Sequence, residues 1–130
     1  MRVSSEDLKG LIKTKLQKAG LKEEHADVAA DVLTFADERG IHSHGAMRVE
    51  YYAERIAKGG INTNPDFKFE KTGPATGVFH GDGGNGHTAA KLAMDEAIKM
   101  AKENGVAIVG VRDISHSGAI SYFTEQAANE

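Results

Sequence analysis

The sequence comprises 130 residues, of which 40% are hydrophobic and 27% are charged, and its formal net charge is −3. These values describe one ordinary soluble domain that is long enough to bury a core. Acidic and basic residues are interspersed without a basic stripe for nucleic acid, and the lack of cysteine excludes disulfides, thiolate metal sites and cysteine nucleophiles. The charged N-terminal segment is unlike a signal peptide or a membrane span, so we expect a cytoplasmic protein.

The N-terminal part of the chain predicts three amphipathic helices. Residues 4–19 carry apolar side chains at helical spacing, with Ser4 and Asp7 placed as a capping box and Gly20 placed as a C-terminal stop. The same spacing predicts a helix over residues 23–38 and a third helix over residues 45–57, before Gly59-Gly60.

After residue 61 the pattern changes to short alternating runs. Residues 67–70 and 76–79 are typical of strands and are separated by Gly73-Pro74. Residues 86–104 then carry a helical apolar stripe, which ends at Gly105.

The continuous apolar run over residues 106–111 indicates a strand covered on both faces, as parallel strands are in α/β proteins. A last helix is predicted over residues 117–130. Because we find no repeat or linker, we expect a single α/β domain over residues 1–130, with the N-terminal helices packed beside a sheet unit.

Polar side chains gather in residues 40–48, between the second and third helices, where two histidines, Ser43 and Arg48 lie close together in sequence. Arg48, Tyr52 and Arg55 follow one another at i+4 and i+3, so one helix face presents two guanidinium groups flanking a phenol. Since arginine binds carboxylates through two parallel hydrogen bonds, this face is a candidate carboxylate site. The alternative is that these side chains only solvate the helix and cap its start.

His42 and His44 also have the spacing of half a metal site, because neutral imidazoles are good ligands. A pair without a nearby carboxylate or a third ligand favours structural or hydrogen-bonding roles instead. We therefore expect no metal.

His116 follows the apolar strand directly and precedes the last predicted helix. This is the position where α/β proteins commonly place reactive groups, and a histidine there can exchange a proton near neutral pH. Oxidation of an alcohol requires such a proton acceptor. The alternative role for His116 is to cap the following helix or to satisfy a turn.

Residues 81–86, with the sequence GDGGNG, match the G-x-G-x-x-G pattern of dinucleotide-binding turns and lie between a predicted strand and a predicted helix. The first strand is short, however, and Asp113 lies later than the usual acidic position. The motif alone leaves a glycine-rich connecting loop as the alternative.

The chain resembles the malate/L-lactate dehydrogenase-like family. The resemblance is carried by residues 39–56, RGIHSHGAMRVEYYAERI, and by residues 116–123, HSGAISYF. It continues through Gly59-Gly60, residues 72–74, the helix at residues 89–91 and residues 105–107, so that it covers essentially the whole chain.

This resemblance implies an oxidoreductase that transfers a hydride between NAD or NADP and a small 2-hydroxy acid. It assigns His116 as the catalytic acid/base and places Ser43, His44, Arg48 and Tyr52 around the substrate and the nicotinamide. The family's dehydrogenase fold is not a Rossmann fold, which makes residues 81–86 a glycine-rich loop. A homodimer is also expected.

Two features depart from the family pattern. Family members are much longer, and most of their cofactor-binding domain lies beyond residue 130, so this chain corresponds to an N-terminal portion. His87 stands where a glutamine is often found. The alternative function is therefore a non-catalytic remnant or binding module that retains only the N-terminal layer of the fold.

Overall fold

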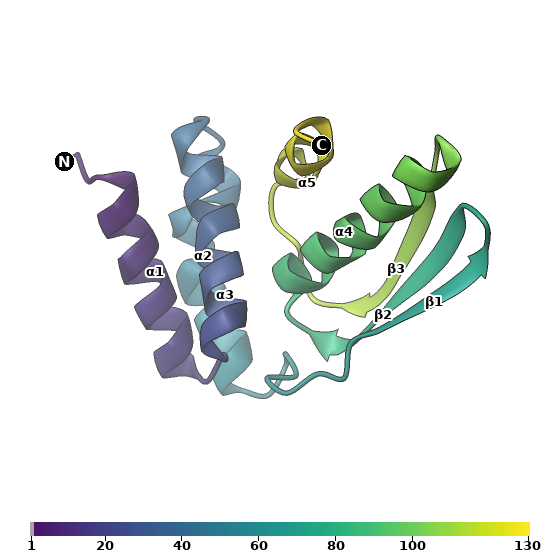
Figure 1. Cartoon of the computed structure of the whole chain (residues 1–130). Helices are drawn as coiled ribbons and strands as arrows, with labels where there is room; N and C mark the ends of the chain where they lie inside the picture. Colours follow the sequence, from purple (N-terminus) through teal and green to yellow (C-terminus); the bar gives the residue numbers. More distant parts are fainter. Residues whose placement is uncertain (1) are drawn as a thin grey trace.

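The computed structural model describes residues 2–130 as a layer of helices beside a small α/β unit (Figure 1). The elements are α1 (Ser5–Ala19), α2 (Glu23–Glu38), α3 (Val49–Ala57), β1 (Lys68–Gly73), β2 (Thr76–Gly84), α4 (Gly86–Asn104), β3 (Ile108–Ile114) and α5 (Ser121–Ala128). The expected α/β architecture, with the N-terminal helices beside a sheet, is confirmed.

Local capping groups set the ends of α1, as the sequence predicts. The Ser4 side chain accepts a hydrogen bond from the Asp7 amide, and Gly20 closes the helix at a φ of 119°. The three N-terminal helices then bury one shared core, formed by Ile12, Leu16, Leu21, Ala26, Ala29, Ala30, Leu33, Tyr52, Ile56 and Ile61. Tyr52 therefore takes its position from a packed helical core.

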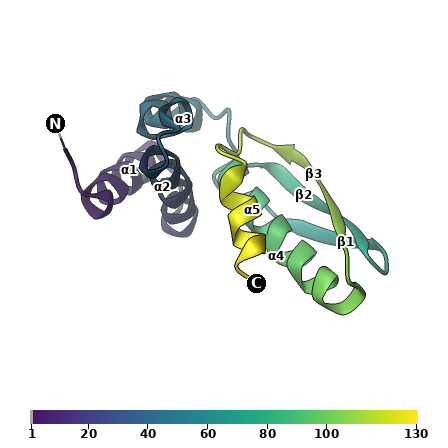
Figure 2. The same cartoon turned by 90° about the horizontal axis from the view of Figure 1, so that it is seen from above.

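The sheet has the order β1-β2-β3, with β1 antiparallel and β3 parallel to β2. Helix α4 connects the two parallel strands and lies against one face of the sheet (Figure 2). Phe79 on β2 packs there against Ala89 and Ala93 of α4. This crossover brings the end of β3 close to the start of α4. His116 lies two residues after the end of β3.

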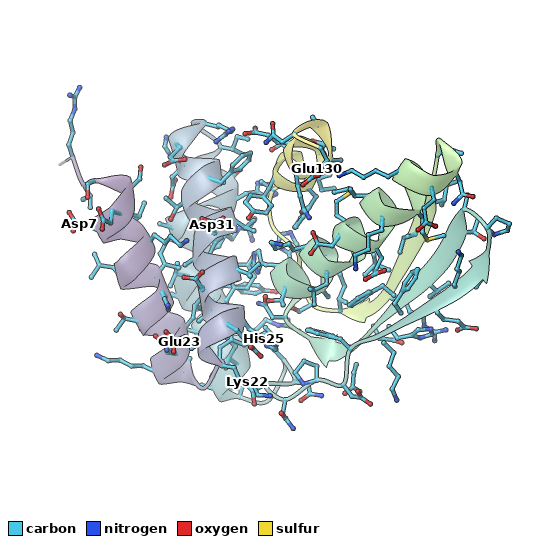
Figure 3. All side chains as sticks on the ribbon, viewed as in Figure 1. Asp7, Lys22, Glu23, His25, Asp31 and Glu130 are labelled. Carbon is cyan, nitrogen blue, oxygen red and sulfur yellow. The ribbon has the colours of Figure 1, made fainter. Side chains whose placement is uncertain are left out.

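Helix α2 joins the two parts of the molecule. His25, which is labelled in Figure 3, lies near one end of α2. The centroid of its ring is 5.5 Å from that of Phe67, and Phe67 belongs to the segment that leads into the sheet. In the middle of the same helix, Asp31 accepts a 2.7 Å hydrogen bond from the Tyr122 hydroxyl of α5. None of the helices in residues 2–130 combines the length and the apolar run that a membrane crossing needs.

The expected covering of the third strand on both faces is wrong for these residues. Ile108 is 70% exposed and Val111 is 40% exposed, because β3 is an edge strand and α4 covers only one face of the sheet. The continuous apolar run correctly predicted a strand but not its surroundings.

Two predicted helices begin later than expected. Residues 42–48 form two short 3₁₀ turns, His42–His44 and Ala46–Arg48, and the α-helix starts only at Val49. Helix α5 starts at Ser121 instead of residue 117, because Gly118 adopts a φ of 82° in the turn after β3. Both irregular turns carry candidate site residues.

Candidate active site

The two irregular turns meet, although they are far apart in sequence. The ring centroids of His44, from the first 3₁₀ turn, and His116, from the turn after β3, lie 5.9 Å apart. Tyr52 reaches His116 from α3, with its hydroxyl 2.7 Å from the imidazole Nδ1 across 64 residues of sequence. The structure thus brings together three of the side chains that sequence analysis proposed.

Tyr52 and the backbone hold one nitrogen of His116. The Gly118 amide points to Nδ1 at 3.3 Å and can only donate, so it favours the tautomer with the hydrogen on Nε2. The Tyr52 hydroxyl is compatible with both tautomers, because it can donate to an unprotonated Nδ1 or accept from Nδ1–H. Nε2 is the nitrogen left for a ligand in both forms.

Burial and nearby charge set the protonation of this pair. Burial of the Tyr52 side chain raises the pKa of its phenol to about 12, so the hydroxyl keeps its proton near neutral pH. Partial burial lowers the pKa of His116 below 6.5, and the nearby Arg48 guanidinium and His44 imidazole lower it further. His116 is therefore predominantly neutral at pH 7 and can accept a proton.

Arg48 lies beside this pair in a fixed orientation. Its Nε donates a 2.7 Å hydrogen bond to the Ser43 carbonyl oxygen, and the Ser43 hydroxyl lies 2.9 Å from His44 Nδ1. With Nε occupied, the two terminal nitrogens of the guanidinium remain to meet a carboxylate. Ser43 therefore orients two of the other site residues.

A pocket of about 400 Å³ opens between the two turns. His44 and His116 contribute its titratable groups, and the remaining wall is formed by Ile41, Ser117, Gly118, Ala119, Ile120 and Ser121. The side chains of Ile41 and Ile120 make part of this wall apolar, beside the imidazole of His116. Of the predicted site residues, His44 and His116 line this pocket, whereas Ser43, Arg48 and Tyr52 are not among its lining residues.

Sequence analysis missed the role of Asp37. Its carboxylate accepts hydrogen bonds of 2.7 Å from the Ala46 amide and from His42 Nδ1. A Cβ on Gly45 would overlap this carboxylate, so Gly45 is required for the turn to close on α2. The expectation that His42 has no nearby carboxylate is wrong, because the helix brings Asp37 back against the turn; within residues 2–130, no three His, Asp or Glu side chains are arranged for a metal.

His87 is the second residue that spacing did not single out. Its ring is fully buried at the start of α4 and meets the Tyr52 ring edge to face, with centroids 4.9 Å apart. The Asn85 side chain caps α4 by accepting a hydrogen bond from the Thr88 amide. The sequence signal for His87 was therefore its position in the first turn of a capped helix, two residues after Asn85.

Arg55 is the residue of the predicted helix face that does not join the cluster. Its Nη1 donates a 3.2 Å hydrogen bond to the Tyr51 hydroxyl, and its guanidinium lies over the ring of the same residue. The two guanidinium groups therefore do not flank the phenol of Tyr52. Only Arg48 of the two belongs to the candidate site.

The glycine-rich residues 81–86 serve close packing. A Cβ on Gly86 would overlap the carbonyl oxygen of Ser115, and the Gly86 amide donates a 2.9 Å hydrogen bond to the Ser115 hydroxyl. The first turn of α4 is thus already occupied by protein groups, which is unlike the open helix start that binds a pyrophosphate.

Comparisons with known proteins agree with this architecture. Ureidoglycolate dehydrogenase (NAD(+)) from Escherichia coli (strain K12) is 59% identical over 128 residues, which cover 98% of this chain and 37% of that protein. L-sulfolactate dehydrogenase from Methanocaldococcus jannaschii is 42% identical over 130 residues, which cover 100% of this chain and 38% of that protein. The solved structure of malate dehydrogenase from Pyrococcus horikoshii OT3 matches with a TM-score of 0.94 at 37% identity, over 99% of this chain and 37% of that one.

This chain therefore spans less than two fifths of the length of these relatives. The family described as malate/L-lactate dehydrogenase matches residues 3–130. Because this match extends over nearly the whole sequence and the fold agrees, the chain belongs to the malate/L-lactate dehydrogenase family.

Proposed function

We propose that this chain provides the acid/base and carboxylate-binding part of a nicotinamide-dependent 2-hydroxy-acid dehydrogenase, with ureidoglycolate as its substrate. The observation that carries the proposal is the pairing of Tyr52 with His116, with the pKa of His116 lowered by burial and by the adjacent Arg48. A neutral imidazole beside a guanidinium is the arrangement that oxidation of a hydroxy acid requires.

In the proposed reaction, Arg48 binds the substrate carboxylate and so places the adjacent hydroxyl at His116. The Nε2 lone pair of His116 accepts the hydroxyl proton, in the form where Nδ1 donates to the Tyr52 oxygen. A nicotinamide, NAD or NADP, would supply the acceptor for the α-hydrogen, which leaves as hydride. The alcohol thereby loses one proton and one hydride and becomes a 2-oxo acid, which is oxalurate in the case of ureidoglycolate.

Two properties support ureidoglycolate over other 2-hydroxy acids. It carries the required carboxylate and hydroxyl on neighbouring carbons, and the E. coli protein named for it is 59% identical to this chain. Malate and lactate carry the same two groups, and relatives named as malate dehydrogenases are 38% identical. The name of the E. coli protein also favours NAD over NADP as the proposed cofactor. We propose allantoin degradation as the setting.

A substrate panel tests this proposal. Residues 1–130 would replace the matching 37% of the E. coli ureidoglycolate dehydrogenase, and NADH formation would be measured with ureidoglycolate, malate and lactate. We expect the highest kcat/KM with ureidoglycolate and none with the carboxamide analogue that lacks the carboxylate. Equal rates with the carboxamide would contradict the role of Arg48, and a preference for malate would move the proposal to that substrate.

A further inference from the structure

We propose that His87 is a positioning residue, which holds Tyr52 and Gly118 against His116 and so fixes the orientation of the acid/base. This inference rests on the proposed function for its kinetic consequence but not for its structural one. It is drawn from the contacts of a buried polar ring that takes no direct part in the proposed reaction.

The tautomer of His87 follows from its neighbours. The Oδ1 of Asn85 accepts from the amide and the hydroxyl of Thr88, both at 3.1 Å, which leaves Asn85 Nδ2 to face His87 Nδ1 at 3.3 Å. An amide nitrogen donates, so Nδ1 of His87 accepts and its hydrogen lies on Nε2. Burial lowers the pKa of His87 to about 3, which keeps the ring neutral at physiological pH.

His87 contacts both groups that hold His116 Nδ1. Its ring meets that of Tyr52 edge to face at 4.9 Å, and Tyr52 carries the hydroxyl that lies 2.7 Å from Nδ1. On its other side, a Cβ added to Gly118 would lie 2.9 Å from Cδ2 and Nε2 of His87, so the Gly118 backbone packs directly on the ring. Gly118 carries the amide that points to the same Nδ1.

The imidazole at this position is not optimal for stability. Among the described residues, His87 Nε2 is a buried atom without a hydrogen-bond partner, and an unpaired buried donor lowers stability. Departures of this kind from good core packing are expected where a residue serves function.

The first test is spectroscopic and needs no activity. In the chain 1–130 labelled with ¹⁵N on histidine, the shifts of His116 Nδ1 and Nε2 report its tautomer. We expect His87→Ala to change these shifts, because Tyr52 and Gly118 lose their support and their contacts with Nδ1 weaken. We expect His87→Gln, which keeps a planar polar group in the site, to restore shifts close to those of the parent chain. Tyr52→Phe should also change these shifts, because it removes the hydroxyl contact with Nδ1.

The second test is kinetic and uses the E. coli chimera defined above. His87→Ala should lower kcat about ten- to a hundredfold with KM little changed, since a small misplacement of a catalytic group has effects of this order. His87→Gln should retain most of the parent kcat. Met100→Ala is the matched control, because Met100 is buried on the same helix, outside the contacts that hold His116, and should lower stability without lowering kcat.

The outcomes separate the two proposals. If His87→Ala only lowers the unfolding temperature and leaves both the His116 shifts and kcat unchanged, then His87 is structural and the inference is wrong. If His87→Gln shows the same loss as His87→Ala, the planar polar group is not what matters, which also overturns it. If the parent chimera oxidises no 2-hydroxy acid while the His116 shifts respond as expected, the proposed function fails and the positioning role stands.

Discussion

His116 and Arg48 lie in one site, but their chemistry gives them different roles. Proton transfer by a positioned base typically contributes about a hundredfold to ten-thousandfold to the rate, so His116→Ala in the chimera should lower kcat by that order. KM should change little, because the carboxylate contact remains. Steady-state kinetics with ureidoglycolate measure both values, and an unchanged kcat would contradict the acid/base role.

Arg48→Ala removes the proposed carboxylate contact instead. A charge-assisted hydrogen bond of this kind contributes about 1.5–3 kcal/mol, which corresponds to roughly ten- to a hundredfold in KM. Some loss of kcat should accompany it, since the hydroxyl is no longer held at His116. Arg48→Lys is the informative control, because it keeps the charge but loses the paired geometry and should recover only part of the binding.

His87 makes stability depend on pH. Its pKa is about 3 in the folded chain and near 6.5 when unfolded, so the unfolded chain binds more protons between these values. Stability from this group is present above pH 6.5 and is lost as the pH falls toward 3, at up to about 1.4 kcal/mol per pH unit. Urea unfolding at pH 7 and at pH 5 measures the free energy of unfolding of the parent chain and of His87→Gln. The stability of the parent chain relative to His87→Gln should fall between pH 7 and pH 5.

An equal stability difference between these two chains at both pH values would show that His87 is not held neutral. His25 is the useful internal check, because burial also lowers its pKa, and its contribution remains in both chains. The comparison therefore isolates His87 from the other titrating groups.

The residues of the candidate site differ in how well sequence could predict them. Ser43, His44, Arg48, Tyr52 and His116 fall in segments that resemble a known family, and the structure brings them close together. Asp37 and His87 could not be identified in this way, because their roles depend on tertiary contacts: the return of the turn to α2 and the approach of α4 to α3. Helical or strand periodicity contains no information on such contacts.

At the scale of elements, the start of α4 determines where His116 lies. Gly86→Ala would push a methyl group into the Ser115 carbonyl, and overpacking of this kind costs about 1–3 kcal/mol. The same variant should lower kcat in the chimera, because the backbone that moves carries His116. Gly10→Ala is the matched control, since a Cβ there meets no atom within 4 Å and alanine favours the interior of α1 by up to about 1 kcal/mol.

Urea unfolding should therefore give opposite signs for the two glycine variants. If Gly86→Ala is as stable as the parent chain, the close approach of α4 to the turn after β3 is not a constraint. The pair also separates the effect of crowding from the general effect of replacing glycine.

Helices were predictable where their own residues set their limits, as in α1, α2 and α4. The sequence was less informative where tertiary contacts decide the backbone: residues 42–48 form 3₁₀ turns because Asp37 accepts from the Ala46 amide. Strand β2 runs on to Gly84, past the alternating run, because it resumes pairing with β3 after an irregularity between His80 and Gly84. An apolar run alone cannot show which of its faces a neighbour will cover.

At the scale of the whole molecule, one sheet edge leaves apolar side chains in water. Val106 and Ile108 are 62% and 70% exposed beside the unpaired edge of β3. We expect the isolated chain to associate with rising concentration, in line with the proposed homodimer, and Ile108→Lys to reduce this association. Light scattering across a concentration series measures it, and a monodisperse monomer at all concentrations would contradict the expectation.

The central claim is that this chain supplies part of a dehydrogenase site that needs further protein to act. The most direct measurement compares NAD-dependent oxidation of ureidoglycolate by the chain 1–130 alone and by the chimera with the rest of the E. coli relative. We expect little or no turnover by the chain alone and robust turnover by the chimera, lowered about a hundredfold to ten-thousandfold by His116→Ala. Robust turnover by the chain alone, or a folded chimera that binds NADH but turns over no 2-hydroxy acid, would contradict it.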